Sequence, residues 1–312
     1  MIRRVAVIGA GLMGHGIAEL FALAGFPVRL CDTSAGRLEA ALRSIADELA
    51  LLAAEGLVTG PEADAAASRI EPTAELERAV AGADLVTEAI PEVLAAKLEL
   101  FERIEVAVAP TALLASNTST FPVTRLAARA RLPGRMVVTH YFNPPHLVPL
   151  VEVHPHPAAP PEVAAVVLDL MRRIGKRPVL VRKEVPGLVA NRLQAAMVRE
   201  AFHLLEEGVA DAEDIDTAVT EGPGIRWPFL GPLATADYGG LDVWQKVVEN
   251  LVPHLGRSEV APPAIAERVR RGELGTKTGR GIFSYAGASV PDLVRERDRR
   301  LAALLRLKAG PR

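Results

Sequence analysis

The stretch VAVIGAGLMG, residues 5–14, decides the fold of this chain. Its first four residues form a continuous apolar run, which suits a strand buried on both faces of a sheet. A glycine turn of the form G-x-G-x-x-G follows at once and opens a helical pattern: Gly9-Ala10-Gly11-Leu12-Met13-Gly14. Asp32 then stands 18 residues beyond Gly14, at the end of the next strand-like run. A strand, a turn, a helix and an acidic residue in this order predict a dinucleotide-binding unit.

Each glycine of the turn has a physical task. Gly9 permits the tight turn, Gly11 lets the backbone approach a pyrophosphate, and Gly14 lets the helix pack against the strand. The free N–H groups and the dipole at the helix start, around Leu12 and Met13, favour the negative charge of a phosphate. We therefore expect all five residues to contact the cofactor.

Asp32 predicts which dinucleotide binds. Its carboxylate can accept hydrogen bonds from the adenosine ribose hydroxyls and would repel a 2′-phosphate, so we predict NAD. Arg37 lies close enough in the sequence to leave an NADP enzyme open. Some FAD enzymes share the turn, so nicotinamide chemistry has to be argued from other residues.

Short strand-like runs alternate with helical patterns between residues 3 and 182. Such alternation indicates parallel strands joined by crossover helices. We therefore predict an α/β Rossmann domain over residues 1–185, with a mostly parallel, doubly wound sheet. The predicted strands are Val5–Ile8, Val28–Cys31, Leu85–Glu88, Leu113–Ala115, Arg135–His140, Leu150–Val153 and Val179–Val181. The predicted helices between the early strands are Leu12–Ala24, Ala35–Glu55, Leu76–Val80 and Val93–Val108.

The pattern changes at Pro186-Gly187, which is a plausible hinge between domains. Beyond it the periodicity is helical and no convincing strand pair is present, so we predict an all-α domain over residues 186–312. Its expected helices are Val189–Glu207, Glu213–Val219, Pro232–Tyr238, Leu241–Leu251 and Pro263–Arg271, followed by a surface helix from Asp292 to Leu307.

The composition excludes several function classes. With 312 residues, 49% of them apolar, the chain can bury the cores of two domains. A net charge of −2 argues against a nucleic-acid surface, and the single cysteine, Cys31, excludes an internal disulfide framework. No apolar run approaches the roughly 20 residues of a membrane span. We expect a soluble, cytoplasmic protein that acts on a small molecule and binds neither membrane nor nucleic acid.

A histidine and a carboxylate stand at unusual positions in two later strands. His140 ends the run Val137-Val138-Thr139, and Glu152 lies inside the apolar run Leu150–Val153. A glutamate inside a buried strand is costly unless it is paired, and a histidine ring N–H is an obvious partner. Such a pair fixes the imidazole tautomer for general-base work. Taken singly, each residue is more simply structural.

Two further polar positions follow apolar segments. Ser116 opens Ser-Asn-Thr-Ser directly after the run Leu113–Ala115, at the strand end where open α/β sheets place their ligands. Asn191 opens the first helix after the predicted hinge. Its amide could cap neighbouring backbone, or it could reach a substrate.

Together these motifs resemble the L-3-hydroxyacyl-CoA dehydrogenase family over nearly the whole chain. The resemblance rests on Gly9–Gly14, Glu88-Ala-Ile-Pro-Glu92 with Lys97, Ser116–Ser119, His140-Tyr-Phe-Asn-Pro144, Leu150-Val-Glu152, Val185–Arg192, Gly240-Leu-Asp242 and Lys277-Thr-Gly-Arg-Gly281.

The resemblance implies roles for the polar residues. His140 would remove the proton from a 3-hydroxyl group, with Glu152 orienting it, while hydride passes to the nicotinamide. Ser116 and Asn191 would hold the reacting oxygen. The nicotinamide side of the cofactor would be contacted by Glu92, Lys97 and Asn143, and Ser116 would also contact the cofactor. The family also implies fatty acid metabolism and a homodimer formed through the helical domain.

Two departures bear on the substrate. Residues 46–56 contain three carboxylates and no Lys or Arg, where CoA-using members are rich in Lys, and Gly224–Pro232 is longer than the corresponding turn. These features are more similar to the branch of lambda-crystallin (L-gulonate 3-dehydrogenase), carnitine dehydrogenase and a pyridine-carboxylate dehydrogenase. Arg226 could then pair with a free substrate carboxylate, or it could cap its loop. A free 3-hydroxy acid is therefore the alternative to a CoA thioester.

Two rival interpretations rank lower. The 6-phosphogluconate-like dehydrogenases open with a similar glycine turn but rely on a catalytic lysine where this chain has Asn191-Arg192. A non-catalytic NAD-binding structural protein would not need His140, Glu152, Ser116 and Asn191 together.

Overall fold

A computed structural model describes residues 2–309 of the chain. Its described residues form two compact units. The first runs to Asn191 and includes Leu301–Ala303, and the second comprises Arg192–Arg300 and the residues from Leu304 onward. Because the candidate site is built mainly in the first unit, that unit is described more fully.

The first unit contains one eight-stranded sheet with the strand order β3-β2-β1-β4-β5-β6-β7-β8. All neighbouring strands are parallel except β6 and β7, which are antiparallel. This confirms the predicted mostly parallel, doubly wound sheet. The strands are β1 (Val5–Ile8), β2 (Val28–Cys31), β3 (Ile70–Thr73), β4 (Leu85–Glu88), β5 (Leu113–Ser116), β6 (Met136–Tyr141), β7 (Leu150–Pro155) and β8 (Arg177–Leu180).

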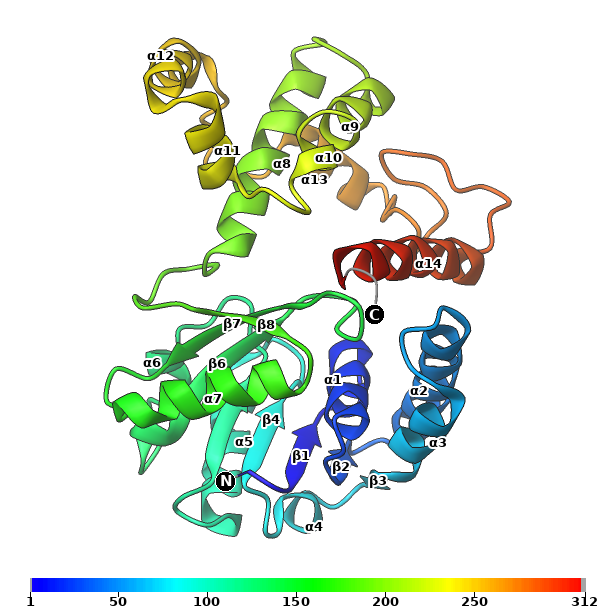
Figure 1. The fold of residues 1–312 in the computed structure, drawn as a ribbon, viewed down its shortest axis with the longest axis vertical. Helices are drawn as coiled ribbons and strands as arrows, with labels where there is room; N and C mark the ends of the chain where they lie inside the picture. The colour runs from blue at the N-terminus through cyan, green and yellow to red at the C-terminus, as the bar shows by residue number, and fades with distance from the viewer. Residues whose placement is uncertain (1, 310–312) are drawn as a thin grey trace. The chain divides into compact units, whose positions relative to one another are not determined.

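Helices cover both faces of the sheet (Figure 1). Val5 and Val7 pack in one core together with α1, α2, α3 and α7, whereas Ala6 and Ile8 pack in a second core with α4, α5 and α6. The continuous apolar run of β1 is needed because both of its faces are buried. The helices are α1 (Leu12–Leu23), α2 (Ala35–Ala54), α3 (Gly60–Ser68), α4 (Leu76–Val80), α5 (Leu94–Ala107), α6 (Val123–Leu126) and α7 (Pro161–Arg173).

The strand order reverses at β1. From β1 the chain passes through α1 to β2 on one side, and it later returns to β4 on the other side of β1. Ligands of open α/β sheets bind in the crevice at the carboxyl ends of the strands at such a point. The glycine turn follows β1 and therefore lies at this crevice.

The second unit is helical, as predicted for the C-terminal part. Its elements are α8 (Ala190–Glu206), which begins at the unit boundary, then α9 (Ala212–Thr220), α10 (Pro223–Arg226), α11 (Pro232–Gly239), α12 (Leu241–Leu251), α13 (Pro263–Arg270) and α14 (Val290–Ala309). Only isolated bridges at Gly275–Arg280 and Arg280–Ser284 are β-like within its described part. Across residues 2–309, no helix combines the length and the apolarity that a bilayer span requires.

Candidate active site

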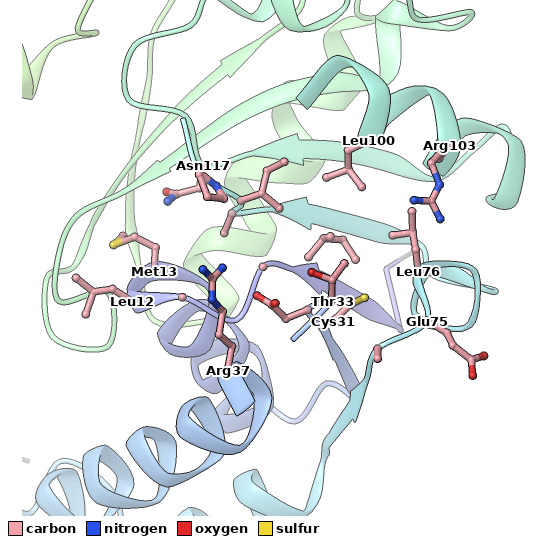
Figure 2. Close-up of a pocket in the computed structure, with 18 of the residues that line it drawn as sticks. Leu12, Met13, Cys31, Thr33, Arg37, Glu75, Leu76, Leu100, Arg103 and Asn117 are labelled. Atoms are coloured by element: carbon pink, nitrogen blue, oxygen red, sulfur yellow. The ribbon is translucent and has the colours of Figure 1, made fainter. Parts of the chain in front are cut away.

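A cavity of about 760 Å³ lies at the carboxyl end of β1 (Figure 2). Residues of the glycine turn, of the segment after β2, of the segments before and after β4 and of α5 line it. They include Gly9, Gly11, Leu12, Met13, Asp32, Thr33, Arg37, Ala89, Ile90, Arg103 and Asn117. This cavity is therefore built around the motif that predicts the cofactor.

The backbone of the turn requires glycine at two positions. Gly9 has φ +104°, and a Cβ on it would lie 2.6 Å from the carbonyl oxygen of Ala89. A Cβ on Gly14 would lie 1.7 Å from the carbonyl oxygen of Gly9, so α1 can start here only without a side chain. No atom lies within 4 Å of a Cβ built on Gly11, so the backbone at Gly11 stands open to the cavity. This arrangement fits a pyrophosphate at the start of α1.

Asp32 is held in place by the same turn. One carboxylate oxygen accepts a hydrogen bond from the backbone N–H of Ala10 at 3.0 Å, and the other accepts one from Ser34 at 2.9 Å. Asp32 is only 9% exposed and lines the cavity. Its lone pairs that remain suit ribose hydroxyls. Arg37 also lines the cavity, so it too could meet the adenosine end of a dinucleotide.

The antiparallel pairing of β6 and β7 brings His140 and Glu152 opposite each other. His140 Nδ1 and Glu152 Oε2 are 2.9 Å apart, and both residues are buried. The other oxygen, Glu152 Oε1, accepts hydrogen bonds from the backbone N–H groups of Val189 and Ala190 at 2.8 and 2.9 Å. Burial alone would raise the pKa of Glu152, but these three donors hold it below its usual value. The carboxylate is therefore ionised, and both of its oxygens have partners.

The chain turns sharply to present those two N–H groups. Gly187 and Leu188 both have positive φ, 76° and 52°, and Leu188 is the one residue other than glycine with this conformation in the described chain. Backbone strain of this kind persists only where the surrounding structure fixes it. Asn191 follows Ala190 as the second residue of α8, so the main chain sets it close in sequence to the donors of Glu152. Phe142 lies against the His140 ring, with centroids 4.5 Å apart.

Ser116 belongs to a buried polar network at the ends of β4 and β5. Its hydroxyl donates to Glu88 Oε2 at 2.5 Å and accepts from the backbone N–H of Thr118 at 3.2 Å. The Lys97 ammonium lies 2.6 Å from Glu88 Oε1 and 3.1 Å from Glu92 Oε2, and it also donates to the carbonyl of Ile90. The described structure thus surrounds this ammonium with protein acceptors.

The two carboxylates that flank Lys97 differ in exposure. Glu88 is completely buried, and burial raises its pKa in spite of the Lys97 charge. Glu92 lies at the surface, and one of its oxygens accepts hydrogen bonds from Thr118, Ser119 and Thr120. Burial opposes these bonds, but together with Lys97 they lower the pKa of Glu92. Glu92 is therefore an ionised carboxylate that organises the loop after β5.

Glu88 was not among the predicted site residues, although it ends the apolar run Leu85–Glu88. The argument that singled out Glu152, a carboxylate inside a buried strand, applies equally to Glu88. Asn117 was also missed. Its side-chain oxygen accepts from the backbone N–H of Tyr141, and it lines the cavity, so it joins the end of β5 to the end of β6.

The remaining predicted residues lie on separate segments. Asn143 is exposed, in the loop after β6 and directly before a cis proline, Pro144. Arg226 is exposed and ends α10 in the second unit. Ser116 is the last residue of β5 and His140 is the last but one of β6, and because these strands are parallel neighbours, both residues lie at the same end of the sheet.

Comparison with known families agrees with this geometry. The family model described as "3-hydroxyacyl-CoA dehydrogenase, NAD binding domain" matches residues 4–185, and the model of the C-terminal domain of the same family matches residues 187–285. The chain therefore binds NAD, through the first of these regions.

Individual relatives carry different substrate names. The chain is 37% identical to a 5-formyl-3-hydroxy-2-methylpyridine 4-carboxylate 5-dehydrogenase of Mesorhizobium japonicum, over 99% of both chains. It is 40% identical to a probable 3-hydroxybutyryl-CoA dehydrogenase of Bacillus subtilis, over 91% of this chain and 98% of the relative. A solved structure of the former kind of enzyme, described as an NAD+-dependent dismutase, aligns over 100% of both chains with a TM-score of 0.94 and 36% identity.

Proposed function

The chain belongs to the 3-hydroxyacyl-CoA dehydrogenase family and is an NAD-dependent dehydrogenase, and from this premise we propose that His140 is the general base in the oxidation of an L-3-hydroxyacyl substrate to its 3-keto product. The observation that carries the proposal is the 2.9 Å contact of His140 Nδ1 with a carboxylate that accepts two further backbone hydrogen bonds. Because Glu152 is ionised, it keeps the proton on Nδ1. Nε2 is then the acceptor for the hydroxyl proton.

NAD, when bound, supplies the hydride acceptor. The residues of this chain position the substrate. We propose that Ser116 and Asn191 hold the reacting oxygen: the Ser116 hydroxyl, which donates to Glu88 in this structure, turns its proton to that oxygen when substrate binds, and the Asn191 amide donates to the same oxygen as it becomes a carbonyl. In this scheme Lys97 acts through Glu88 and Glu92 and does not contact the cofactor directly, while Asn143 meets the nicotinamide side.

A second candidate substrate is a free 3-hydroxy acid, and the charge of α2 favours it. The segment from Ala46 to Gly56 contains no Lys or Arg that could pair with the phosphates of CoA, and Asp47 is exposed there, whereas Glu48 is engaged by His15. The full-length similarity to a 5-formyl-3-hydroxy-2-methylpyridine 4-carboxylate 5-dehydrogenase supports a free carboxylate on the substrate, although by its name that relative acts at a formyl group and not at a 3-hydroxyl.

One assay distinguishes the two substrate classes. NADH formation is followed with L-3-hydroxybutyryl-CoA, L-gulonate, L-carnitine and 5-formyl-3-hydroxy-2-methylpyridine 4-carboxylate, and each reaction is repeated with NADP. A kcat/KM at least about tenfold higher for the thioester, which corresponds to about 1.4 kcal/mol, supports a CoA substrate. The reverse order supports the free acid. Failure to reduce NAD with any of the four compounds would contradict both substrate proposals.

Arg226 provides a more specific test of the free-acid substrate. If its guanidinium pairs with the substrate carboxylate, Arg226→Ala removes a charge-assisted interaction of about 1.5–3 kcal/mol. We expect KM for the free acid to rise roughly 10- to 100-fold, with a much smaller change for an acyl-CoA. Arg270→Ala, at an exposed position of α13 in the same unit, is the control. Unchanged kinetics would remove Arg226 from the site.

We further propose a homodimer formed through the helical unit, working in the cytoplasm. Large apolar side chains of that unit are exposed in the single chain, among them Leu193, Leu233, Tyr238 and Leu241, at 59–83%. Exposed apolar surface of this extent is typical of a protein interface. Sedimentation equilibrium should give twice the chain mass of 33.2 kDa, and charged substitutions at Leu233 and Tyr238 should shift it to the monomer. A monomeric wild-type protein would contradict the dimer.

A further inference from the structure

A second cluster of ionisable side chains lies in the first unit and uses no residue of the proposed catalytic machinery. Helix α1 contributes His15 and Glu19, helix α2 contributes Glu48, and the loop after β6 contributes His146. Helices α1 and α2 run side by side on one face of the sheet (Figure 1). The side chains of Glu19 and His146 are almost fully buried.

Three of these side chains converge on one point. A carboxylate oxygen of Glu19, a carboxylate oxygen of Glu48 and a ring nitrogen of His146 all lie within 4.8 Å of one another. His146 Nδ1 is already 3.3 Å from Glu48 Oε2. Ligand atoms around a tetrahedral zinc ion stand about 3.3 Å apart, because metal–ligand distances are about 2.0–2.1 Å. Small side-chain rotations would bring all three atoms to that spacing.

The converging atoms make no well-directed hydrogen bonds. Within the described chain, none with good geometry reaches either oxygen of Glu19, Glu48 Oε2 or the ring nitrogens of His146, although Glu48 Oε2 and His146 Nδ1 lie within ion-pair distance. Glu19 has no exposed surface at all. Buried carboxylates are normally paired or bound to a metal, because an isolated one is strongly destabilising. The converging atoms therefore point to a ligand that lies between them.

We propose that Glu19, Glu48 and His146 bind a transition-metal dication of the zinc class. Two carboxylate oxygens and one imidazole nitrogen form a ligand set that suits zinc, with water in the fourth position. His15 would orient the set without ligating, because its Nε2 contacts Glu48 Oε1 at 2.9 Å and its Nδ1 contacts the carbonyl of Gly11. Such outer partners typically fix a ligating carboxylate.

Lys176 is the competing counter-charge for Glu19. Its buried ammonium donates to the backbone carbonyls of Pro145 and Val148, and burial lowers the pKa of Lys176 to about 7. No hydrogen bond from Lys176 to Glu19 is present.

The ion would join α1, α2 and the loop that carries Asn143. Because a ligand that binds only the folded state stabilises it, zinc should raise the melting temperature of the full-length chain. The protein is stripped with EDTA and dialysed against zinc chloride, and bound zinc is then counted by elemental analysis. We expect one zinc per chain and a Tm several degrees above that of the stripped protein.

Variants locate the ion. Glu19→Gln and His146→Gln keep the side-chain size, and each should weaken zinc binding at least about tenfold. Glu39→Gln, at an exposed position of α2, is the matched control and should bind zinc as the wild type does. Circular dichroism of each stripped variant checks that it folds, and Glu48→Gln replaces any variant that does not.

Two results would overturn the proposal. If the wild type retains no zinc and its Tm does not respond, the cluster is a proton-sharing network balanced by Lys176. If the Gln variants retain zinc as the wild type does, the ion binds elsewhere. Neither readout uses turnover, so the outcome is independent of the role proposed for His140.

Discussion

Replacing His140 by alanine should lower kcat roughly 10²- to 10⁴-fold, which is the usual contribution of a positioned general base. Among the described residues, His140 is the one whose side chain is hydrogen-bonded to Glu152, the other two donors being backbone N–H groups, so we expect no neighbouring side chain to take over the proton. The affinity for NADH, measured by fluorescence titration, should stay close to that of the wild type, because the glycine turn and Asp32 are built from other segments. The lower kcat would then reflect a slower chemical step and not weaker binding of the cofactor.

Two companion variants sharpen this test. Glu152→Gln keeps the side-chain volume but loses the charge that fixes the proton on Nδ1, so kcat should fall, and the double variant with His140→Ala should be no slower than His140→Ala alone. His254→Ala, at an exposed histidine of the second unit, is the control. If turnover survives in His140→Ala, the proposed mechanism is wrong.

Replacing Lys97 by methionine should lower the free energy of unfolding by about 3–5 kcal/mol, as is typical when one partner of a buried ion pair is removed. The Lys97 ammonium is 2% exposed and its partner Glu88 is completely buried, so the carboxylate would be left without its cation. Because burial already raises the pKa of Glu88, protonation of the carboxyl would limit the loss. Urea denaturation at neutral pH measures the difference.

The matched control is Lys183→Met, since Lys183 is exposed and its replacement should change the stability little. The double variant Glu88→Gln/Lys97→Met should recover part of the loss, because it buries no unpaired charge. A Lys97→Met protein as stable as the wild type would show that the pair does not hold the ends of β4 and β5 together.

The sequence predicted the inner strands well because their physics is local. β1, β2 and β4 begin and end at the predicted residues, since each is a short run rich in apolar residues that starts directly after a polar residue or a proline: Arg4, Pro27 and Asp84. β3 was missed because Ile-Glu-Pro-Thr is neither apolar nor alternating. Its proline is tolerated only because β3 is the last strand of the sheet. α3 was also missed, although Thr59 and Glu62 form a capping box before it.

The residues of the candidate site also fall into those that could be predicted from the sequence and those that could not. The glycine turn and Asp32 could be read from spacing, because all of their partners lie within one βαβ unit. The sequence suggested that His140 and Glu152 form a pair, because of their residue types. Their position opposite each other depends on the antiparallel register of β6 and β7, which only the structure shows. The cluster of Glu19, Glu48 and His146 has no sequence signature, because its members come from three segments that meet only in the folded unit.

The two donors that hold Glu152 are main-chain groups of Val189 and Ala190, and this has an evolutionary consequence. Any residue except proline carries the same N–H, so ordinary substitutions at these two positions leave the support of the carboxylate intact. The side chains at positions 189 and 190 can therefore change without removing the two backbone donors to Glu152, the carboxylate that holds His140. An enzyme of this fold would thus keep the support of its imidazole even where the two side chains at these positions differ.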